Sequence, residues 1–112
     1  MSDSKEADLT ASVRTMLKDI GIFHWKQWQG PMSQPKGVSD ILGIIEGRMF
    51  AIELKRPGWK PPKPGKTTAW KHHSQQEFFL KTIRENGGIA FFAQSIDEVI
   101  DGLGIRNRFL FN

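Results

Sequence analysis

The stretch "GVSDILGIIEGRMFAIELKR", residues 37–56, decides the predicted fold because it contains two apolar segments around a turn. Glu46 and Gly47 stand between these segments, and such a dipeptide suits a two-residue hairpin turn. We therefore expect two paired strands, over residues 40–45 and 48–55. Charged residues interrupt this apolar hairpin, where a charge is costly unless something compensates it.

The turn also determines which residues of the two strands face each other. Counting outward from it pairs Leu42 with Ala51, and the next pair on the same face joins Asp40 to Glu53. Directly opposed residues have Cβ atoms about 5 Å apart. Two carboxylates from neighbouring strands should therefore lie side by side.

Strand alternation separates the apolar from the charged residues of the second segment. One face receives Phe50, Ile52 and Leu54, and the opposite face receives Ala51, Glu53 and Lys55. We therefore expect the charged side chains to form one patch, back to back with a face that belongs to the core.

Opposed carboxylates repel each other unless a proton, a cation or solvent compensates them. Hard oxygen ligands a few ångströms apart suit Mg²⁺, which keeps several waters and accepts phosphate oxygens. Lys55, one pleat beyond Glu53, could orient a water or help to deprotonate it. The alternative is a surface ion pair at the end of a sheet, either Glu53–Lys55 or Asp40–Lys55, and the pattern alone leaves both interpretations open.

A helix is predicted over residues 5–19, where apolar residues recur at helical spacing. Glu6 stands one turn before Leu9 on the apolar face, so its carboxylate can reach towards the core. In the alternative, Asp3 is the N-cap and Glu6 closes a capping box. The sequence does not decide between them.

Gln76 is a further candidate on a second long helix, because it shares the core-facing stripe with Leu80 and Ile83. Gln75 lies instead on a more mixed face of this helix. A glutamine on a buried stripe needs a hydrogen-bond partner, and a carboxylate, a water or a phosphate would serve. The alternative is an ordinary polar residue at a helix start.

The other expected elements complete an α/β domain around a mixed sheet, in the order αβββαβα. Ser74 and Glu77 form a capping box that is expected to open the second helix, which Gly87 and Gly88 end. A strand is expected over residues 22–28, another over 89–94, and a short capped helix over 95–103.

The chain has 112 residues and a net charge of +4, which predicts one domain, residues 1–112, with a mild preference for polyanions. It contains no cysteine, so disulfides and cysteine-ligated metals are excluded. No apolar run is long enough for a membrane span, and the N-terminal residues lack the apolar core of a signal peptide. We therefore expect an intracellular, cytoplasmic protein without membrane contact.

A basic loop, residues 56–73, is the one compositional break, with four of the six prolines. No acidic residue lies between Glu53 and Glu77, whereas Trp59 and Trp70 lie between them among many cations. Basic groups with interleaved aromatics suit phosphate contact and base stacking, although each tryptophan could instead pack in the core. The predicted DNA contacts are Lys36, Arg56, Lys60, Lys63, Lys66, Lys71, His72 and His73.

The segments "GVSD" (37–40), "AIELK" (51–55) and "SQQEFFLKTIRENGG" (74–88) resemble the VRR-NUC family of the PD-(D/E)xK nuclease superfamily. The likeness runs from Glu6 to Leu103 and implies a restriction-endonuclease-like αβββαβα core, with a mixed central sheet flanked by helices. Ser39 departs from the family, which more often has proline there. The long basic loop is a second departure, and it bears on substrate preference more than on reaction type.

The resemblance implies a role for each candidate. Asp40 and Glu53 would bind Mg²⁺ or Mn²⁺ with the backbone carbonyl of Leu54, and Lys55 would position or activate the attacking water. Gln76 would complete the site, with a one-residue ambiguity towards Gln75. Glu6 would be an outer or water-mediated ligand.

Members of this family cut nucleic-acid backbones, and small stand-alone members are similar to phage-type Holliday junction resolvases that act as dimers in a bacterial host. We therefore expect a metal-dependent, structure-selective endodeoxyribonuclease that resolves four-way junctions as a homodimer. The alternatives are a non-catalytic nucleic-acid-binding module, a nuclease for duplex or flap DNA, and an RNA-directed nuclease. The tail, residues 104–112, offers Phe109, Leu110 and Phe111 either to a dimer interface or to its own sheet.

Overall fold

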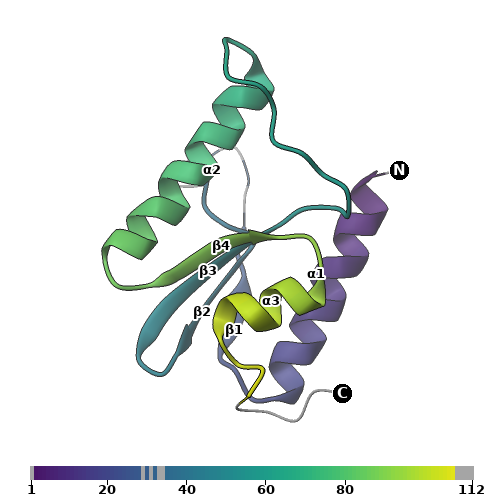
Figure 1. Cartoon of the computed structure of the whole chain (residues 1–112), viewed down its shortest axis with the longest axis vertical. Coiled ribbons are helices and arrows are strands. Elements are labelled where there is room, and N and C mark those ends of the chain that lie inside the picture. Colours follow the sequence, from purple (N-terminus) through teal and green to yellow (C-terminus); the bar gives the residue numbers. More distant parts are fainter. Residues whose placement is uncertain (1, 29, 31, 33–34, 108–112) are drawn as a thin grey trace.

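The structure is a computed structural model that describes residues 2–28, 30, 32 and 35–107. Within these ranges the chain forms a mixed four-stranded sheet with three helices, in the predicted order αβββαβα (Figure 1). The elements are α1 (Ser2–Asp19), β1 (His24–Lys26), β2 (Ile41–Ile45), β3 (Arg48–Leu54), α2 (Thr68–Glu85), β4 (Ile89–Ala93) and α3 (Ile96–Leu103). No helix in the described ranges is long and apolar enough to cross a membrane.

The strands lie in the spatial order β1-β2-β3-β4. β2 pairs antiparallel with both β1 and β3, whereas β3 and β4 run parallel. The parallel pair needs a crossover, and α2 supplies it between β3 and β4 (Figure 1). The apolar cluster on one face joins α1 and α3 to the sheet, and the cluster on the other face joins α2 to it.

The central hairpin has the predicted turn and the predicted register. Glu46 and Gly47 adopt φ values of 50° and 78°, the left-handed conformation that a tight hairpin turn requires at both positions. Leu42 pairs with Ala51, and Ile41 pairs with Ile52. The next residues outward are therefore Asp40 and Glu53, as the sequence predicted.

Helix α2 begins at Thr68, so Ser74 lies inside it rather than at its N-cap, and the expectation of an irregular segment through residue 73 is wrong at its end. Thr67 is the N-cap, because its hydroxyl accepts a hydrogen bond from the backbone N–H of Trp70 at 3.1 Å. The last proline of the segment is Pro64, so nothing in the chain prevents a helix from Thr68 onward. The capping-box pattern of Ser74 and Glu77 had predicted a later start for this helix.

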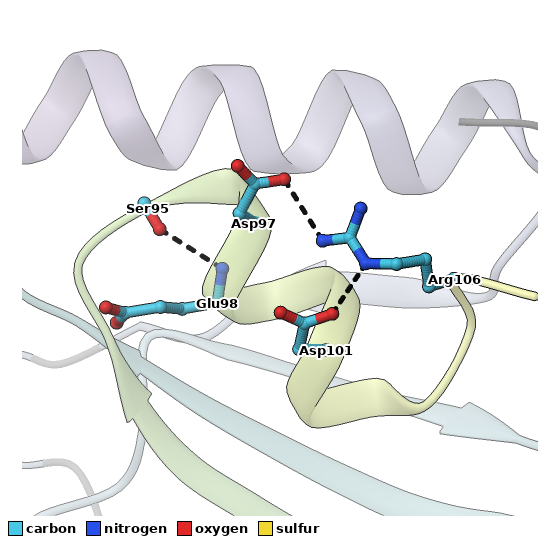
Figure 2. A network of polar contacts seen from close by, with 5 residues as sticks. All are labelled: Ser95, Asp97, Glu98, Asp101 and Arg106. Atoms are coloured by element: carbon cyan, nitrogen blue, oxygen red, sulfur yellow. Dashed lines mark hydrogen bonds and ion pairs between the residues drawn. The ribbon is translucent and has the colours of Figure 1, made fainter. Parts of the chain in front are cut away.

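The predicted cap of α3 is present. The Ser95 hydroxyl accepts from the backbone N–H of Glu98 at 3.1 Å (Figure 2). The Glu98 carboxylate accepts from the N–H of Gln94, one residue before the N-cap. Arg106, after α3, binds both Asp97 and Asp101 on that helix (Figure 2). The candidate dimer residues Phe109, Leu110 and Phe111 lie outside the described residues.

Candidate active site

The predicted carboxylate pair meets at one end of the central hairpin. Asp40 immediately precedes β2 and is held from two sides. Its Oδ2 accepts from the backbone N–H of Leu54 at 2.9 Å, and its carbonyl accepts from the N–H of Gln27 at 2.8 Å. Its carboxyl also lies within hydrogen-bonding reach of the Glu53 carboxyl on β3. Strand register thus brings two acidic groups from separate segments close enough for Asp40 to raise the pKa of Glu53.

Glu53 occupies an environment that disfavours its charge. The residue is 3% exposed, and burial is the main cause that raises the pKa of its carboxyl well above the usual value. The charge and the hydrogen bond of Asp40 raise this pKa further, whereas Lys55 lowers it. Oxygen Oε1 of Glu53 is buried and accepts no hydrogen bond from the described residues. A proton or a cation would relieve this arrangement.

Lys55 and Gln76 complete a compact polar group with Glu53. The Lys55 ammonium donates to Oε1 of Gln76 at 3.1 Å, and the Gln76 amide donates to Oε2 of Glu53 at 3.3 Å. The Lys55 ammonium also lies 3.7 Å from Oε2 of Glu53. The Gln76 side chain therefore links Glu53 to Lys55. The residue in this position is Gln76 rather than Gln75.

Gly37 explains how the middle of α2 comes so close to the hairpin. Its φ of 74° is a left-handed conformation, which glycine adopts most readily. A Cβ atom at this position would lie 2.3 Å from the backbone carbonyl carbon of Gln75 and 2.7 Å from the nitrogen of Gln76. The first residue of the "GVSD" segment thus allows the loop to touch the helix backbone beside the Gln76 side chain.

Glu6 lies near the site as well. Its side chain is half-buried, and its charge makes the smallest of the contributions that raise the pKa of Glu53. Helix α1 begins at Ser2, so Asp3 stands within the helix rather than at its N-cap. This geometry favours the orientation of Glu6 towards the sheet over the capping-box alternative.

The donor set suits a hard divalent cation. Two carboxyl groups lie side by side, and the buried Oε1 of Glu53 accepts no hydrogen bond from the described residues. Mg²⁺ usually takes one or two carboxylates and keeps several waters, so two such ligands suffice. The described residues contain no cluster of three or more His, Cys, Asp or Glu side chains for a metal. The role predicted for the Leu54 carbonyl stays a prediction.

The cations predicted to contact DNA divide into two groups. Seven of the eight are exposed: Lys36, Arg56, Lys60, Lys63, Lys66, Lys71 and His72. His73 is different, because it is only 5% exposed and its Nε2 lies 3.2 Å from the carboxylate of Glu77. The imidazole of His73 is therefore not placed at the surface as a phosphate contact would require.

An aromatic cluster beside the site was not predicted. The rings of Trp59 and His73 both stack on Phe92, at centroid distances of 5.5 and 5.4 Å, and Trp70 packs against His73 at 5.6 Å. The Lys55 ammonium lies 5.1 Å from the centroid of Trp59. The spacing of Trp70 and His73, one helical turn apart, was the available signal, but it is visible only once α2 is known to begin at Thr68.

The site therefore combines a buried carboxyl group, a neighbouring ammonium and an amide that hydrogen-bonds to both. Such a group can bind a divalent cation and orient a water or a phosphate. The chain matches no known family model, and comparisons with curated proteins and with solved structures also found no match.

Proposed function

We propose that this protein is a metal-dependent, structure-selective endodeoxyribonuclease that hydrolyses phosphodiester bonds in branched DNA, with four-way junctions as its preferred substrate. The pairing of Asp40 with Glu53 carries the proposal, because it sets a second carboxyl beside a buried one whose Oε1 accepts no hydrogen bond from the described residues, while Lys55 lies 3.7 Å from its Oε2. A structural ion pair alone would not require the second carboxylate.

In this proposal Asp40 and Glu53 hold Mg²⁺ or Mn²⁺. The ion would supply charge stabilisation to the phosphorus centre and lower the pKa of the attacking water. Lys55 orients the water and neutralises charge that develops on the phosphate. Gln76 holds the Lys55 ammonium by its carbonyl oxygen and Glu53 by its amide, so both charged groups keep their positions before substrate arrives.

The exposed cations of the β3–α2 connection support a nucleic-acid substrate. Arg56, Lys60, Lys63 and Lys66 lie between the site and the first turn of α2, and all are exposed. Contacts to phosphates position a protein on DNA without reading its sequence, which suits an enzyme that recognises shape. A two-fold symmetric homodimer would place one site on each of two opposed strands of a junction.

One gel tests this proposal. The wild-type protein and Glu53→Gln are incubated with a labelled four-way junction, a flap, a linear duplex and a single strand, in Mg²⁺, Mn²⁺ or chelator. We expect metal-dependent cutting that is fastest on the junction, and a loss of roughly 10³-fold in Glu53→Gln with DNA binding retained.

Two outcomes would contradict parts of the proposal. If wild-type protein binds DNA but cuts none of the four substrates with either metal, it is a non-catalytic binding module. If linear duplex is cut as fast as the junction, the structure selectivity is wrong while the nuclease assignment stands.

A further inference from the structure

A second binding feature adjoins the candidate active site. A cavity of about 500 Å³ opens between the β3–α2 connection and the first turns of α2. Lys55 and Gln76, both part of the site, form one of its walls. A ligand in this cavity would therefore lie directly beside the group that contains Glu53.

The cavity is formed before any ligand arrives, because a tight turn shapes it. The N–H of Trp59 donates to the carbonyl of Arg56 at 3.1 Å, and Gly58 between them has a φ of 84°. The Gln94 side chain accepts from the N–H of Gly58 at 2.9 Å and donates to the carbonyl of Trp59 at 3.0 Å. Two hydrogen bonds from β4's end thus hold the turn in place.

The lining combines two kinds of chemistry. Arg56, Lys60 and His72 supply donors for a phosphate, and no carboxylate in the described part of the chain lines the cavity. Trp59, Pro62 and Ala69 supply an apolar wall. Cations alone would be enough to bind the phosphate backbone of a paired duplex. The apolar wall adds to the binding free energy only if a base leaves the stack and packs against it.

We infer that this cavity binds a single unpaired nucleotide of the DNA strand, next to the phosphodiester bond to be cut. The phosphate lies against Arg56 and Lys60, and the base lies against the wall of Trp59, Pro62 and Ala69. The inference rests on the proposed function, because it takes the bond beside Glu53 as the bond that breaks. It also bears on selectivity: flaps supply unpaired nucleotides, and the base pairs at a branch point open more readily than those inside a continuous duplex.

The test measures binding in chelator, so that its result does not depend on cleavage. Ala69→Trp fills the cavity from an exposed position of α2, and Thr82→Trp is a matched control, exposed on the same helix and remote from the cavity lining. We expect Ala69→Trp to weaken binding of a short oligothymidylate about tenfold, measured by fluorescence anisotropy. The control should bind like wild type, and blunt duplex should bind equally to all three proteins.

An abasic scan identifies the base that enters the cavity. One base is removed at each position of the oligonucleotide in turn, and binding is compared between wild type and Ala69→Trp. We expect one position where base removal weakens wild-type binding several-fold but leaves the variant unchanged, because both changes remove the same contact. Thermal melting of each variant verifies folding.

The outcomes separate this inference from the proposed function. If Ala69→Trp binds single strands as tightly as Thr82→Trp, or no abasic position is sensitive, the cavity does not bind a base, even if the protein cuts DNA. If one abasic position is sensitive but the protein never cuts DNA, the nucleotide-binding site stands and the proposed nuclease activity is wrong. Tighter binding of the matching ribo-oligonucleotide would overturn the assignment to DNA.

Discussion

The two faces of β3 differ sharply in chemistry, although they belong to the same seven residues. On one face Phe50, Ile52 and Leu54 are fully buried in an apolar cluster with α1 and α3. On the other face Ala51 packs under α2, and Glu53 is buried beside it with a charged partner on each side. Alternation along one strand thus separates the apolar cluster that stabilises the fold from the polar group proposed to do the chemistry.

Two alanines on the second face leave room for α2 to come close. Its cluster contains Ala51 and Ala90 on neighbouring strands, with Leu80 of α2 above them. Gly37 adds a direct backbone approach at the start of the site. A buried carboxyl on this face is costly, and the larger apolar cluster on the opposite face offsets that cost.

The largest effect is expected on the apolar face. Phe50→Ala removes a ring that is 0% exposed, so it should lower the free energy of unfolding by about 3–5 kcal/mol. Urea denaturation followed by circular dichroism measures this change. Met49→Ala, at the exposed neighbouring position, is the control and should change it far less. If Phe50→Ala lowers the free energy of unfolding by less than about 1 kcal/mol, this face of β3 is not the main hydrophobic core.

Gly37→Ala tests the close approach on the other face, with Gly21→Ala as its matched control. Both glycines have left-handed φ values, 74° and 79°, but a Cβ at Gly21 would meet no atom within 4 Å. The control should therefore cost only about 1–2 kcal/mol for the backbone conformation. Gly37→Ala should cost a further 1–3 kcal/mol, roughly, because its Cβ collides with the α2 backbone. Equal losses in thermal melting would show that the contact with α2 is loose.

Glu53→Gln should increase the stability of the protein, in contrast to the two substitutions above. In metal-free protein at neutral pH, replacing a buried carboxyl that is costly to ionise beside Asp40 should raise the free energy of unfolding by roughly 1–3 kcal/mol. Glu85→Gln is the control, because Glu85 is exposed on α2. Thermal melting in chelator measures both. If Glu53→Gln is less stable than wild type, the Glu53 carboxyl stabilises the fold, and this would count against its proposed role as a metal ligand.

The pH dependence follows from the same raised pKa. Because native Glu53 keeps a proton that the unfolded chain releases, the native state binds more protons and stability falls as pH rises. Its contribution is complete below the ordinary value of 4.5 and is lost as the pH passes through the raised value in the folded protein. The advantage of Glu53→Gln over wild type should therefore be small in acid and grow towards neutral pH. An advantage independent of pH would exclude this cause.

Much of this arrangement was predictable from the sequence because it depends on local rules. The Glu46-Gly47 turn fixes the register, and the register places Asp40 against Glu53. The start of α2 was not predictable in the same way. The segment before it is rich in proline and glycine, and the residues that stabilise its first turns, Phe92 above all, lie elsewhere in the chain. Contacts between distant segments override a local pattern at such points.

The smallest expected effect concerns the two neighbouring glutamines of α2, of which one contacts the polar face of β3. The helical face predicted Gln76, and the structure places its amide between Lys55 and Glu53. A residue that orients a site without reacting typically contributes 10–100-fold to activity, so Gln76→Ala should slow cleavage by about that factor. Gln75→Ala should leave the cleavage rate unchanged, because its side chain points along another face of α2. The pH profile of Gln76→Ala should also shift, since the lost amide no longer donates to Glu53. Equal rates for the two variants would remove Gln76 from the site and leave the carboxylate pair and Lys55 as the whole of it.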